Sequence, residues 1–387
     1  MKQGWEIKKL GEVCEIQGGS TPKRTESLYW DGGTYPWFTI EDIREQGRII
    51  TDTKQKVTKV AWDKLRVFPK DTVLLCCTAS IGEYAITHIP LTSNQQFNGL
   101  MIKDKSYLNP MYLMHYCATL KDKLAMLSGK ATIDFVPAEK VRQITIPIPP
   151  IEEQERIVAE LDCLSGVIER KREQLRELDA LAPSIFYQMF GNPITNEKGW
   201  EVKKLGEVAY IGLGFTHTPE YVEDGVAFLS VKDISSGEIC WDNIKYVSQQ
   251  EYDSAPKGAK PNKGDIMFCR VGTMGKPVIV DTDIPFCTFV SLGYLHILDE
   301  DILNVYVKYW MQSYAFDVQV EEYVKGVAIK NLNTGWLKTF NIQHPPISLQ
   351  QEFADKIEAI EKQKALIKKS ISETENLFNA RMDYYFN

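Results

Sequence analysis

The sequence has no pair of cysteines at the spacing that metal sites use. Its eight cysteines form no CxxC motif and its five histidines are scattered, so no zinc-ligand pattern is present. No stretch approaches the roughly 18 uninterrupted apolar residues that a membrane span needs, and the opening residues, MKQGWEIKKLGEV, have no apolar signal region. We therefore expect a cytoplasmic protein with reduced, mostly buried thiols and no metal site.

Motifs for catalysis are also missing. GLGFTH (212–217) lacks the third glycine of a dinucleotide loop, and GTMGKP (272–277) lacks the spacing and hydroxyl of a phosphate-binding P-loop. NPIT (192–195) has neither the second proline nor the aromatic residue of an amino-methyltransferase motif, and is interpreted as a turn. No set of Ser, His and Asp repeats along the chain. We expect a protein that is not an enzyme and binds no cofactor of its own.

The formal net charge of -7 argues at first sight against a nucleic-acid partner. The charge is unevenly spread, however. Residues 1–150 carry 20 basic and 16 acidic side chains, whereas residues 191–346 carry 14 basic and 20 acidic ones. Any contact with DNA must therefore come from local clusters, or from positive surface that a partner adds.

The chain is long enough for two or three domains, and it contains one unit written twice. GWEIKKLGEV at 4–13 matches GWEVKKLGEV at 199–208 in nine of ten positions. PPIEEQERIVAELDCL at 149–164 corresponds to PPISLQQEFADKIEAI at 345–360. The stretches between them match more loosely, as in PWFTIEDI (36–43) against AFLSVKDI (227–234). Two copies whose ends match closely and whose middle segments diverge are typical of two modules that recognise different ligands.

Each copy has about 145 residues rich in Gly, Pro and aromatic residues with short β-branched runs, followed by a helical pattern of about 40 residues. A Pro-Pro pair precedes each helical part, as expected just ahead of a helix N-terminus. We expect an α+β protein in which two pseudo-repeated α/β domains are joined by two long antiparallel coiled-coil helices. The expected boundaries are 1–150, 151–190, 191–346 and 347–387.

Both helical parts have apolar residues at alternating spacings of three and four, which predicts a coiled-coil seam. The alternative is a long helix packed on its own domain, but 40 residues span about 60 Å, which is too long for one domain of this size to cover. The first seam is Ile157, Leu161, Leu164, Ile168, Lys171, Leu175, Leu178, Ala182, Ile185 and Met189. The second is Phe353, Ile357, Ile360, Lys364, Ile367, Ile371, Thr374, Phe378, Arg381 and Tyr385.

DNA bases are read by Arg, Lys, Asn, Gln, Ser and Thr side chains on loops or strands that enter a groove. Comparable loops occur in both copies: GGSTPKRTE (18–26) and GLGFTHTPE (212–220), the polar residues after the apolar runs at 72–77 and 266–269, and SGKATIDF (128–135) and KGVAIKNLN (325–333). Ordinary polar loops are the alternative for each. Arg270 is the strongest candidate, because an Arg after an apolar strand and beside small residues can approach guanine. The candidates are Ser20, Thr21, Lys23, Arg24, Thr78, Ser80, Gln95, Gln96, Lys130, Thr216, His217, Thr218, Arg270, Thr273, Lys330 and Asn331.

The combination of GW-x-x-K-K-L-G-E-V opening each copy, IPIPPIEEQERIV at 146–158 and MFGNPITNEKGW at 189–200 resembles the specificity subunits of type I restriction-modification systems, the HsdS family. The resemblance covers the whole chain. In the second copy PPISLQQEF replaces the EEQERI core, so the two helices need not bind partners equally.

The resemblance implies two target-recognition domains, each reading one half of a bipartite double-stranded DNA sequence, with the helices as a ruler for the unread spacer. It implies as partners two N6-adenine methyltransferase (modification) subunits and, through them, restriction subunits. Methylation and cleavage would belong to those partners.

Aromatic residues near the helix ends are expected to be exposed and are candidate anchors for the modification subunits; the alternative is that they cap the end of the coiled coil. They are Phe186, Phe190, Tyr384 and Phe386. Two other functions remain open: a coiled-coil protein adaptor without DNA readout, and a degenerate DNA methyltransferase.

Overall fold

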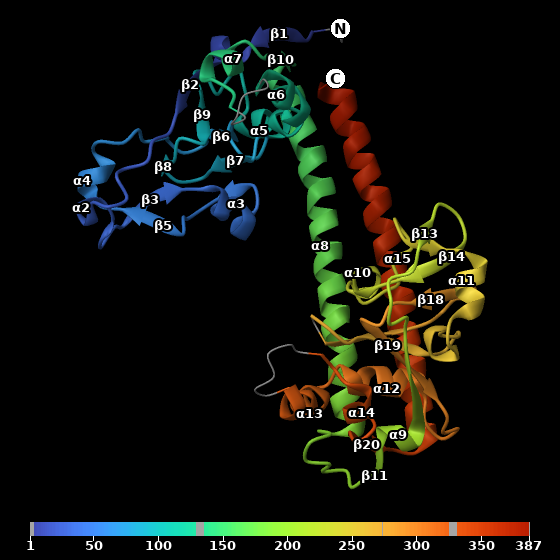
Figure 1. The fold of residues 1–387 in the computed structure, drawn as a ribbon. Helices are drawn as coiled ribbons and strands as arrows, with labels where there is room; N and C mark the ends of the chain where they lie inside the picture. Colours follow the sequence, from blue (N-terminus) through green and yellow to red (C-terminus); the bar gives the residue numbers. More distant parts are fainter. Residues whose placement is uncertain (1–3, 129–134, 273, 325–330, 387) are drawn as a thin grey trace. The chain divides into compact units, whose positions relative to one another are not determined.

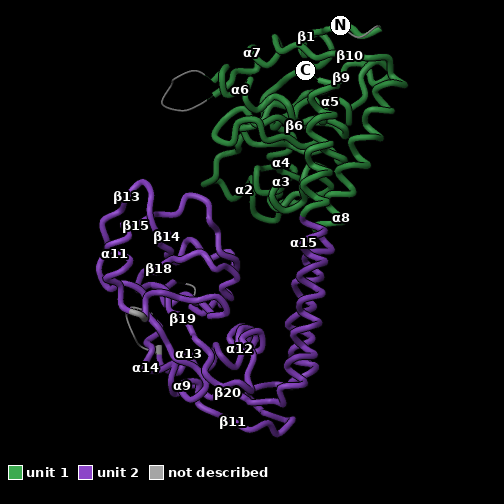
Figure 2. Tube along the Cα trace, turned by 90° about the vertical axis from the view of Figure 1, so that its right-hand side faces the viewer, with its two compact units in different colours: residues 1–172, 369–387 green, residues 173–368 purple. Residues whose placement is uncertain are grey.

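The computed structural model describes residues 4–128, 135–272, 274–324 and 331–386. The chain divides into two compact units (Figures 1 and 2): unit 1 contains residues 1–172 and 369–387, and unit 2 contains residues 173–368. Each unit is an α/β body that shares both long helices with the other. Among the described residues, no helix is long and apolar enough to cross a membrane.

Unit 1 is built on a five-stranded sheet of order β2-β9-β6-β7-β4, with a three-stranded sheet β5-β3-β8 and the pair β1-β10 beside it. The strands are β1 (Glu6–Lys9), β2 (Cys14–Gly18), β3 (Tyr35–Phe38), β4 (Ile49–Ile50), β5 (Gln55–Val57), β6 (Val73–Cys76), β7 (Tyr84–Thr87), β8 (Thr92–Ser93), β9 (Phe97–Ile102) and β10 (Thr145–Ile148). The short helices are α1 (Leu10–Val13), α2 (Ser27–Trp30), α3 (Ile40–Gln46), α4 (Lys59–Trp62), α5 (Pro110–Ala118), α6 (Lys121–Ser128) and α7 (Ala138–Arg142).

The central strand β6 is apolar throughout because both of its faces are covered. Successive side chains of a strand point to opposite faces. Val73, Leu75 and Cys77 therefore enter the core formed with α5 and the long helices, and Leu74 and Cys76 enter the core formed with the three-stranded sheet. The adjacent Cys76 and Cys77 thus lie in different cores.

Unit 2 repeats this plan with sheets of order β12-β19-β16-β17 and β13-β15-β14-β18 and the pair β11-β20. The strands are β11 (Glu201–Lys204), β12 (Ala209–Leu213), β13 (Tyr221–Val222), β14 (Val226–Leu229), β15 (Lys245–Val247), β16 (Ile266–Cys269), β17 (Gly275–Ile279), β18 (Phe286–Thr288), β19 (Leu292–Ile297) and β20 (Asn341–His344). The short helices are α9 (Leu205–Val208), α10 (Val231–Ile234), α11 (Gln249–Ser254), α12 (Asn304–Met311), α13 (Tyr314–Val324), α14 (Thr334–Leu337) and a 3-10 turn (Lys257–Ala259).

The pairing registers confirm the internal repeat. In unit 1, Glu6 pairs with Ile148 in an antiparallel ladder, and in unit 2, Glu201 pairs with His344. The two pairs are separated by the offsets of 195 and 196 that the sequence shows. The helix capping boxes repeat as well, with Thr39 and Asp42 in one unit and Ser230 and Asp233 in the other. The expected fold of two pseudo-repeated α/β domains joined by long helices is confirmed.

The long helices are α8 (Ile151–Phe190) and α15 (Ile347–Phe386). In unit 1 the first part of α8 packs on the last part of α15, where Ile157 and Leu161 share a core with Met382 and Tyr385. Hydrogen bonds and ion pairs also join these antiparallel parts of the two helices. The Glu160 carboxylate bonds the Arg381 guanidinium at 2.5 Å and the Tyr385 hydroxyl at 2.6 Å.

In unit 2 the last part of α8 packs on the first part of α15. Ala182 and Phe186 of α8 share a core with Phe353 and Ile357 of α15. Asp179 of α8 forms an ion pair with Lys364 of α15, with 2.7 Å between the carboxylate oxygen and the ammonium nitrogen. Every predicted seam position of α15 is buried or half-buried. The antiparallel coiled coil is therefore confirmed, including its polar positions: Lys171, where the first seam is broken, donates to the Ser370 hydroxyl.

Candidate nucleic-acid interface

One edge of the unit 1 sheet gathers three of the loops that the sequence analysis selected. β2, β9 and β6 are adjacent and antiparallel, so the end of β2 (Gly18), the start of β9 (Phe97) and the end of β6 (Cys76) lie at the same edge. The loop after β2 holds Ser20 to Arg24, the loop before β9 holds Gln95 and Gln96, and the turn after β6 holds Thr78 and Ser80. We call these loops the unit 1 edge.

Close backbone contact holds two of these loops together. The amide groups of Gly19 and Ser20 donate to the Phe97 and Ser93 carbonyls at 3.0 and 2.8 Å. A side chain at Gly19 would not fit, since its Cβ would lie 2.1 Å from the Ser93 hydroxyl oxygen and 2.4 Å from the Asn94 carbonyl oxygen. Only glycine allows this approach.

Side chains of the two loops also bond each other. The Thr21 hydroxyl donates to the Gln95 amide oxygen and so joins the two loops. Within the loop before β9, the Asn94 amide nitrogen donates to the Gln96 amide oxygen at 2.8 Å. Gln95 is exposed and Gln96 half-buried. Three consecutive amides at a surface edge can pair with the polar edge of a base, and adenine offers the matching donor and acceptor.

Lys23 and Arg24 are both exposed but are held differently. Lys23 pairs with Glu26 at 3.2 Å and its side chain is 79% exposed. The Arg24 guanidinium lies over the rings of Trp30 and Trp37, 4.0 and 4.5 Å from their centroids. It also donates to the Gln55 amide oxygen at 2.8 Å.

Thr78 and Ser80 lie in the turn between β6 and β7, where both are half-buried. The turn is tight, with Ala79 at a φ of 62° and Gly82 at 88°. The Cys77 amide group donates to the Gln96 carbonyl at 2.8 Å, which ties the turn to the amide cluster. Lys130, the remaining candidate of this copy, lies outside the described residues.

The equivalent edge of unit 2 has the same backbone but different side chains. The Phe215 amide group donates to the Thr288 carbonyl at 2.7 Å, beside Gly214, where a Cβ would lie 2.2 Å from that same oxygen. Thr216, His217 and Thr218 follow and are exposed. His217 bonds the Glu251 carboxylate at 2.9 Å. We call this edge, with the segments at 270–272 and 289–291, the unit 2 edge.

Arg270 is not the accessible side chain that its place after an apolar strand predicts. It is 7% exposed, and its guanidinium donates to the main-chain carbonyls of Leu332 and Val290 at 3.0 and 2.7 Å. Burial lowers the pKa of this group. Arg270 thus joins two segments of the edge and is not a free surface side chain. Its contact with a base stays a prediction, and such a contact would require these bonds to rearrange.

Of the last loop, the structure describes only its end. Asn331 is exposed and forms an isolated bridge with Val271, as Phe135 does with Thr78 in unit 1. Thr273 and Lys330 lie outside the described residues. The two copies therefore bring their loops to the same place on the sheet.

Three residues that hold Arg24 are not among the predicted site residues: Trp30, Trp37 and Gln55. Trp37 lies in β3 and Gln55 in β5, and the two strands pair. Trp30 lies in α2, whereas Trp37 and Gln55 meet Arg24 only through the packing of the β5-β3-β8 sheet, so no local pattern marks them.

The aromatic residues at the end of α8 are buried and not exposed as predicted. Phe186 and Phe190 are 1% and 3% exposed. Both pack on Tyr306 of α12 and on Phe353 of α15, with ring centroids 4.8 to 5.8 Å apart. They are core residues of unit 2, so the expectation that they are exposed is wrong, and their burial favours the alternative that they cap the end of the coiled coil.

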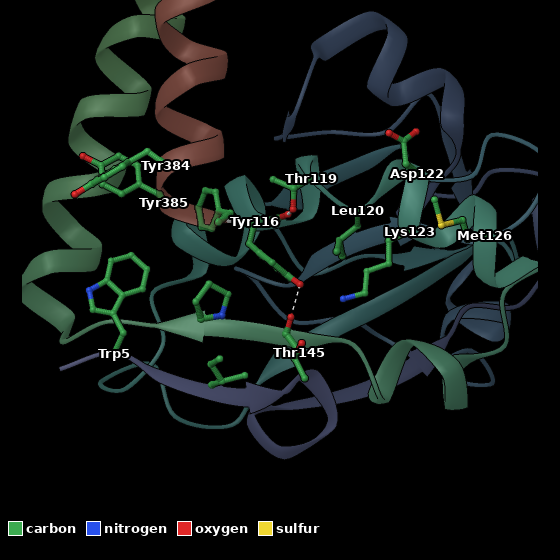
Figure 3. Close-up of a pocket in the computed structure, with 13 residues that line it drawn as sticks. Trp5, Tyr116, Thr119, Leu120, Asp122, Lys123, Met126, Thr145, Tyr384 and Tyr385 are labelled. Carbon is green, nitrogen blue, oxygen red and sulfur yellow. Dashed lines mark hydrogen bonds between the residues drawn. The ribbon is translucent and has the colours of Figure 1, made fainter. Parts of the chain in front are cut away.

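In unit 1, Phe386 fills the corresponding position, 7% exposed and packed on Tyr112 and Tyr116 of α5. Tyr384, in contrast, is 58% exposed. It lines a pocket of about 870 Å³ (Figure 3) together with Trp5, Tyr116 and Met126, and Met126 is 84% exposed. Of the four aromatic candidates, Tyr384 alone has the surface exposure that an anchor needs.

Within the described ranges, no group of three or more His, Cys, Asp or Glu side chains is placed to hold a metal ion. The polar groups of both edges are amides, hydroxyls and single charged side chains, a set suited to hydrogen bonding with bases and phosphates.

Comparison with known proteins gives a consistent result. Residues 2–180 and 197–376 each match the family described as type I restriction modification DNA specificity domain. The MjaIX specificity subunit of a type I restriction enzyme from Methanocaldococcus jannaschii is 29% identical over 373 residues, 90% of this chain and 85% of that protein. The EcoprrI specificity subunit from Escherichia coli is 32% identical over 156 residues, 39% of this chain and 38% of that protein.

Solved structures agree on the fold. The S subunit of a type I restriction-modification system from M. genitalium superposes with a TM-score of 0.57 at 14% identity, over 99% of this chain and 96% of that one. A chain from a structure of type I restriction-modification complex assembly gives a TM-score of 0.64 at 20% identity, over 100% and 98%. Since the specificity-domain family matches both halves, the chain belongs to the type I restriction-modification specificity subunits and contains two specificity domains.

Proposed function

We propose that this chain reads a bipartite double-stranded DNA target, one half with each unit, and scaffolds two N6-adenine methyltransferase subunits. Restriction subunits join through those partners, and methylation and cleavage belong to the partners. The chain itself has no catalytic role, and we place its action in the cytoplasm, where the host DNA lies.

The observation that carries this proposal is the contrast between the two edges. Their backbones are equivalent, with Gly19 and Gly214 at the same close approach. Their side chains differ: Asn94, Gln95 and Gln96 precede β9, whereas Phe289, Val290 and Ser291 precede β19. Two edges with equivalent backbones but different polar side chains are suited to recognising two different DNA sequences.

Methylation of host DNA tests the reading function. The chain is co-expressed with its methyltransferase partner, and N6-methyladenine is mapped by single-molecule sequencing. We expect one bipartite motif with a fixed gap. Methylation that is absent, or that is unchanged when this chain is deleted, would count against the proposal and favour the protein adaptor.

Variants of the two edges test which unit recognises which half of the DNA motif. Gln95→Ala with Gln96→Ala should relax or change one half of the motif, and Thr216→Ala with His217→Ala the other half. An exposed pair away from both edges, Gln174→Ala with Glu177→Ala on α8, should leave the motif intact. Equal loss of both halves in every variant would argue against separate readers.

Partner binding is tested at the exposed end of α15. Tyr384→Asp and Met126→Asp replace two large exposed side chains that line the pocket of Figure 3 by negative charges, and should reduce co-purification with the methyltransferase. Leu28→Asp is the control, since Leu28 is 62% exposed in the same unit but lies in α2. Undiminished yield in the Tyr384 and Met126 variants would remove this pocket as a docking site.

A further inference from the structure

Three cations near the unit 1 edge bond neutral partners. Arg24 donates to the Gln55 amide at 2.8 Å, Lys64 to the Tyr29 hydroxyl at 3.1 Å and Arg66 to the Gly18 carbonyl at 3.3 Å. Within the part of the chain that the structure describes, no carboxylate oxygen lies within 4.0 Å of their nitrogen atoms. Their charges are therefore positioned but not compensated.

The three cations surround one loop. Arg66 bonds the first residue of Gly18–Glu26, Arg24 lies within that loop, and Lys64 bonds Tyr29 in the helix that follows it. Figure 1 shows that α2 and α4 lie side by side next to β3 and β5, and α2 and α4 are in contact. All three side chains are exposed.

Aromatic rings hold two of these cations in place. Arg24 lies over Trp30 and Trp37, which themselves meet edge to face at 5.0 Å between centroids. The Lys64 ammonium group lies 5.0 Å from the Tyr29 ring centroid. Such contacts restrict a long side chain before any ligand binds, which lowers the entropy cost of a later contact.

We propose that Arg24, Lys64 and Arg66 form a phosphate-binding surface for the DNA backbone, distinct from the base-reading amides of the same edge. The inference rests on the proposed function. It predicts that unit 1 supplies sequence-independent affinity that positions the edge on the duplex, because phosphate contacts fix register while base contacts specify sequence.

Unit 2 has a different charge in the equivalent segment. Residues 19–69 of unit 1 carry nine basic and seven acidic side chains, whereas residues 214–262 carry four basic and eight acidic ones. The loop of unit 2 offers His217, which bonds Glu251 at 2.9 Å. The phosphate-binding surface is therefore a property of unit 1 and not of the repeat.

The same segment of unit 1 provides a matched control. Lys54, Lys56 and Lys59 pair with Glu45, Asp52 and Asp63 at 2.8, 3.1 and 2.5 Å. Replacing each triple by Gln removes three positive charges, but only the first triple is free of carboxylate partners. A mere effect of net charge would make the two triples equal.

The experiment measures duplex DNA affinity of the chain assembled with its methyltransferase partner, at a series of salt concentrations. The slope of log K against log salt is negative, and each lost phosphate contact reduces its magnitude by about 0.9. We expect the Arg24→Gln, Lys64→Gln, Arg66→Gln triple to reduce this magnitude by about 2 to 3, and the paired-lysine triple by less than about 1.

A third variant separates charge from folding. Arg24→Lys, Lys64→Arg and Arg66→Lys keep the charges and should keep most of the slope. An unchanged slope in the Gln triple, or equal slopes in the two Gln triples, would overturn the inference. The slopes are measured on duplex DNA of any sequence, so they test this surface separately from the methylated motif, which tests the proposed function.

Discussion

Gln154 and Gln350 make the same hydrogen bonds in the two units, at the start of α8 and of α15. Each is fully buried. The Gln154 amide nitrogen donates to the Pro149 and Tyr107 carbonyls at 2.8 and 2.9 Å, and its oxygen accepts from the Asn109 amide group at 2.8 Å. Gln350 repeats these contacts around Pro345. A glutamine thus joins the start of each long helix to the loop before α5 or α12.

Replacing this glutamine should destabilise its unit. Gln154→Leu leaves buried carbonyl and amide groups without partners, at a cost of about 1 to 3 kcal/mol for each unpaired group. We expect a lower free energy of unfolding in urea, with a similar loss for Gln350→Leu. Gln174→Leu, at an exposed position of α8, should change stability by less than about 0.5 kcal/mol. Equal stability of all three variants would contradict this account.

Truncating Phe186 should act on folding. It is 1% exposed in an aromatic cluster, and Phe→Ala in a core costs about 3 to 5 kcal/mol. Thermal unfolding should shift strongly for Phe186→Ala and little for Leu181→Ala, since Leu181 on the same helix is 43% exposed. A fully stable Phe186→Ala variant that lost its methyltransferase partner would restore the anchor interpretation.

A methyl group at Gly19 should disturb one half of the target. The Cβ of Gly19→Ala would collide with the Ser93 hydroxyl and the Asn94 carbonyl, so the loop of Ser20 to Arg24 must move away from the amide cluster. At the adjacent Gly18 the nearest atom to a Cβ is 3.4 Å away, which makes Gly18→Ala the control. The mapped motif should change in one half for Gly19→Ala only, and an unaltered motif would show that the loop pairing is not needed for readout.

Thiol labelling of the native protein should be selective. Cys163 and Cys240 are exposed, whereas the other six cysteines are buried. Burial raises the pKa of Cys14 and of Cys287 to about 12 and that of Cys77 to about 11, so these thiols stay protonated and unreactive near neutral pH. Iodoacetamide followed by peptide mass mapping should modify two sites before unfolding and eight after it. Rapid labelling of Cys14 or Cys287 in the folded protein would contradict the burial.

Much of the fold could be predicted from the sequence because it is repeated. Openings at residues 4 and 199 that match in nine of ten positions establish two copies, and the three-four spacing from Ile157 to Met189 establishes a seam. Both are local or periodic signals, which survive in the sequence without knowledge of packing. The structure also brings several of the predicted loops together, because the sheet order places the end of β2, the start of β9 and the end of β6 side by side, while their contact with DNA stays a prediction.

The roles of individual side chains depend on contacts that are distant in sequence. Arg270 is buried because Val290 and Leu332 present carbonyls to it, and no residue near position 270 announces this. Phe186 and Phe190 satisfy the helix pattern equally well as exposed or as buried residues. Their place was decided by α12 and α15, which pack on them from the second copy.

The division of the long helices also sets the order in which the protein can fold during synthesis. The core of unit 1 includes Met382, Tyr385 and Phe386 of α15 beside Ile157 and Tyr112. Ile157 and Tyr112 must therefore wait for residues made more than two hundred positions later before their core is closed. Unit 2 has no such delay, since residues 173–368 are continuous in the chain. The second unit to leave the ribosome is consequently the first that can complete its core.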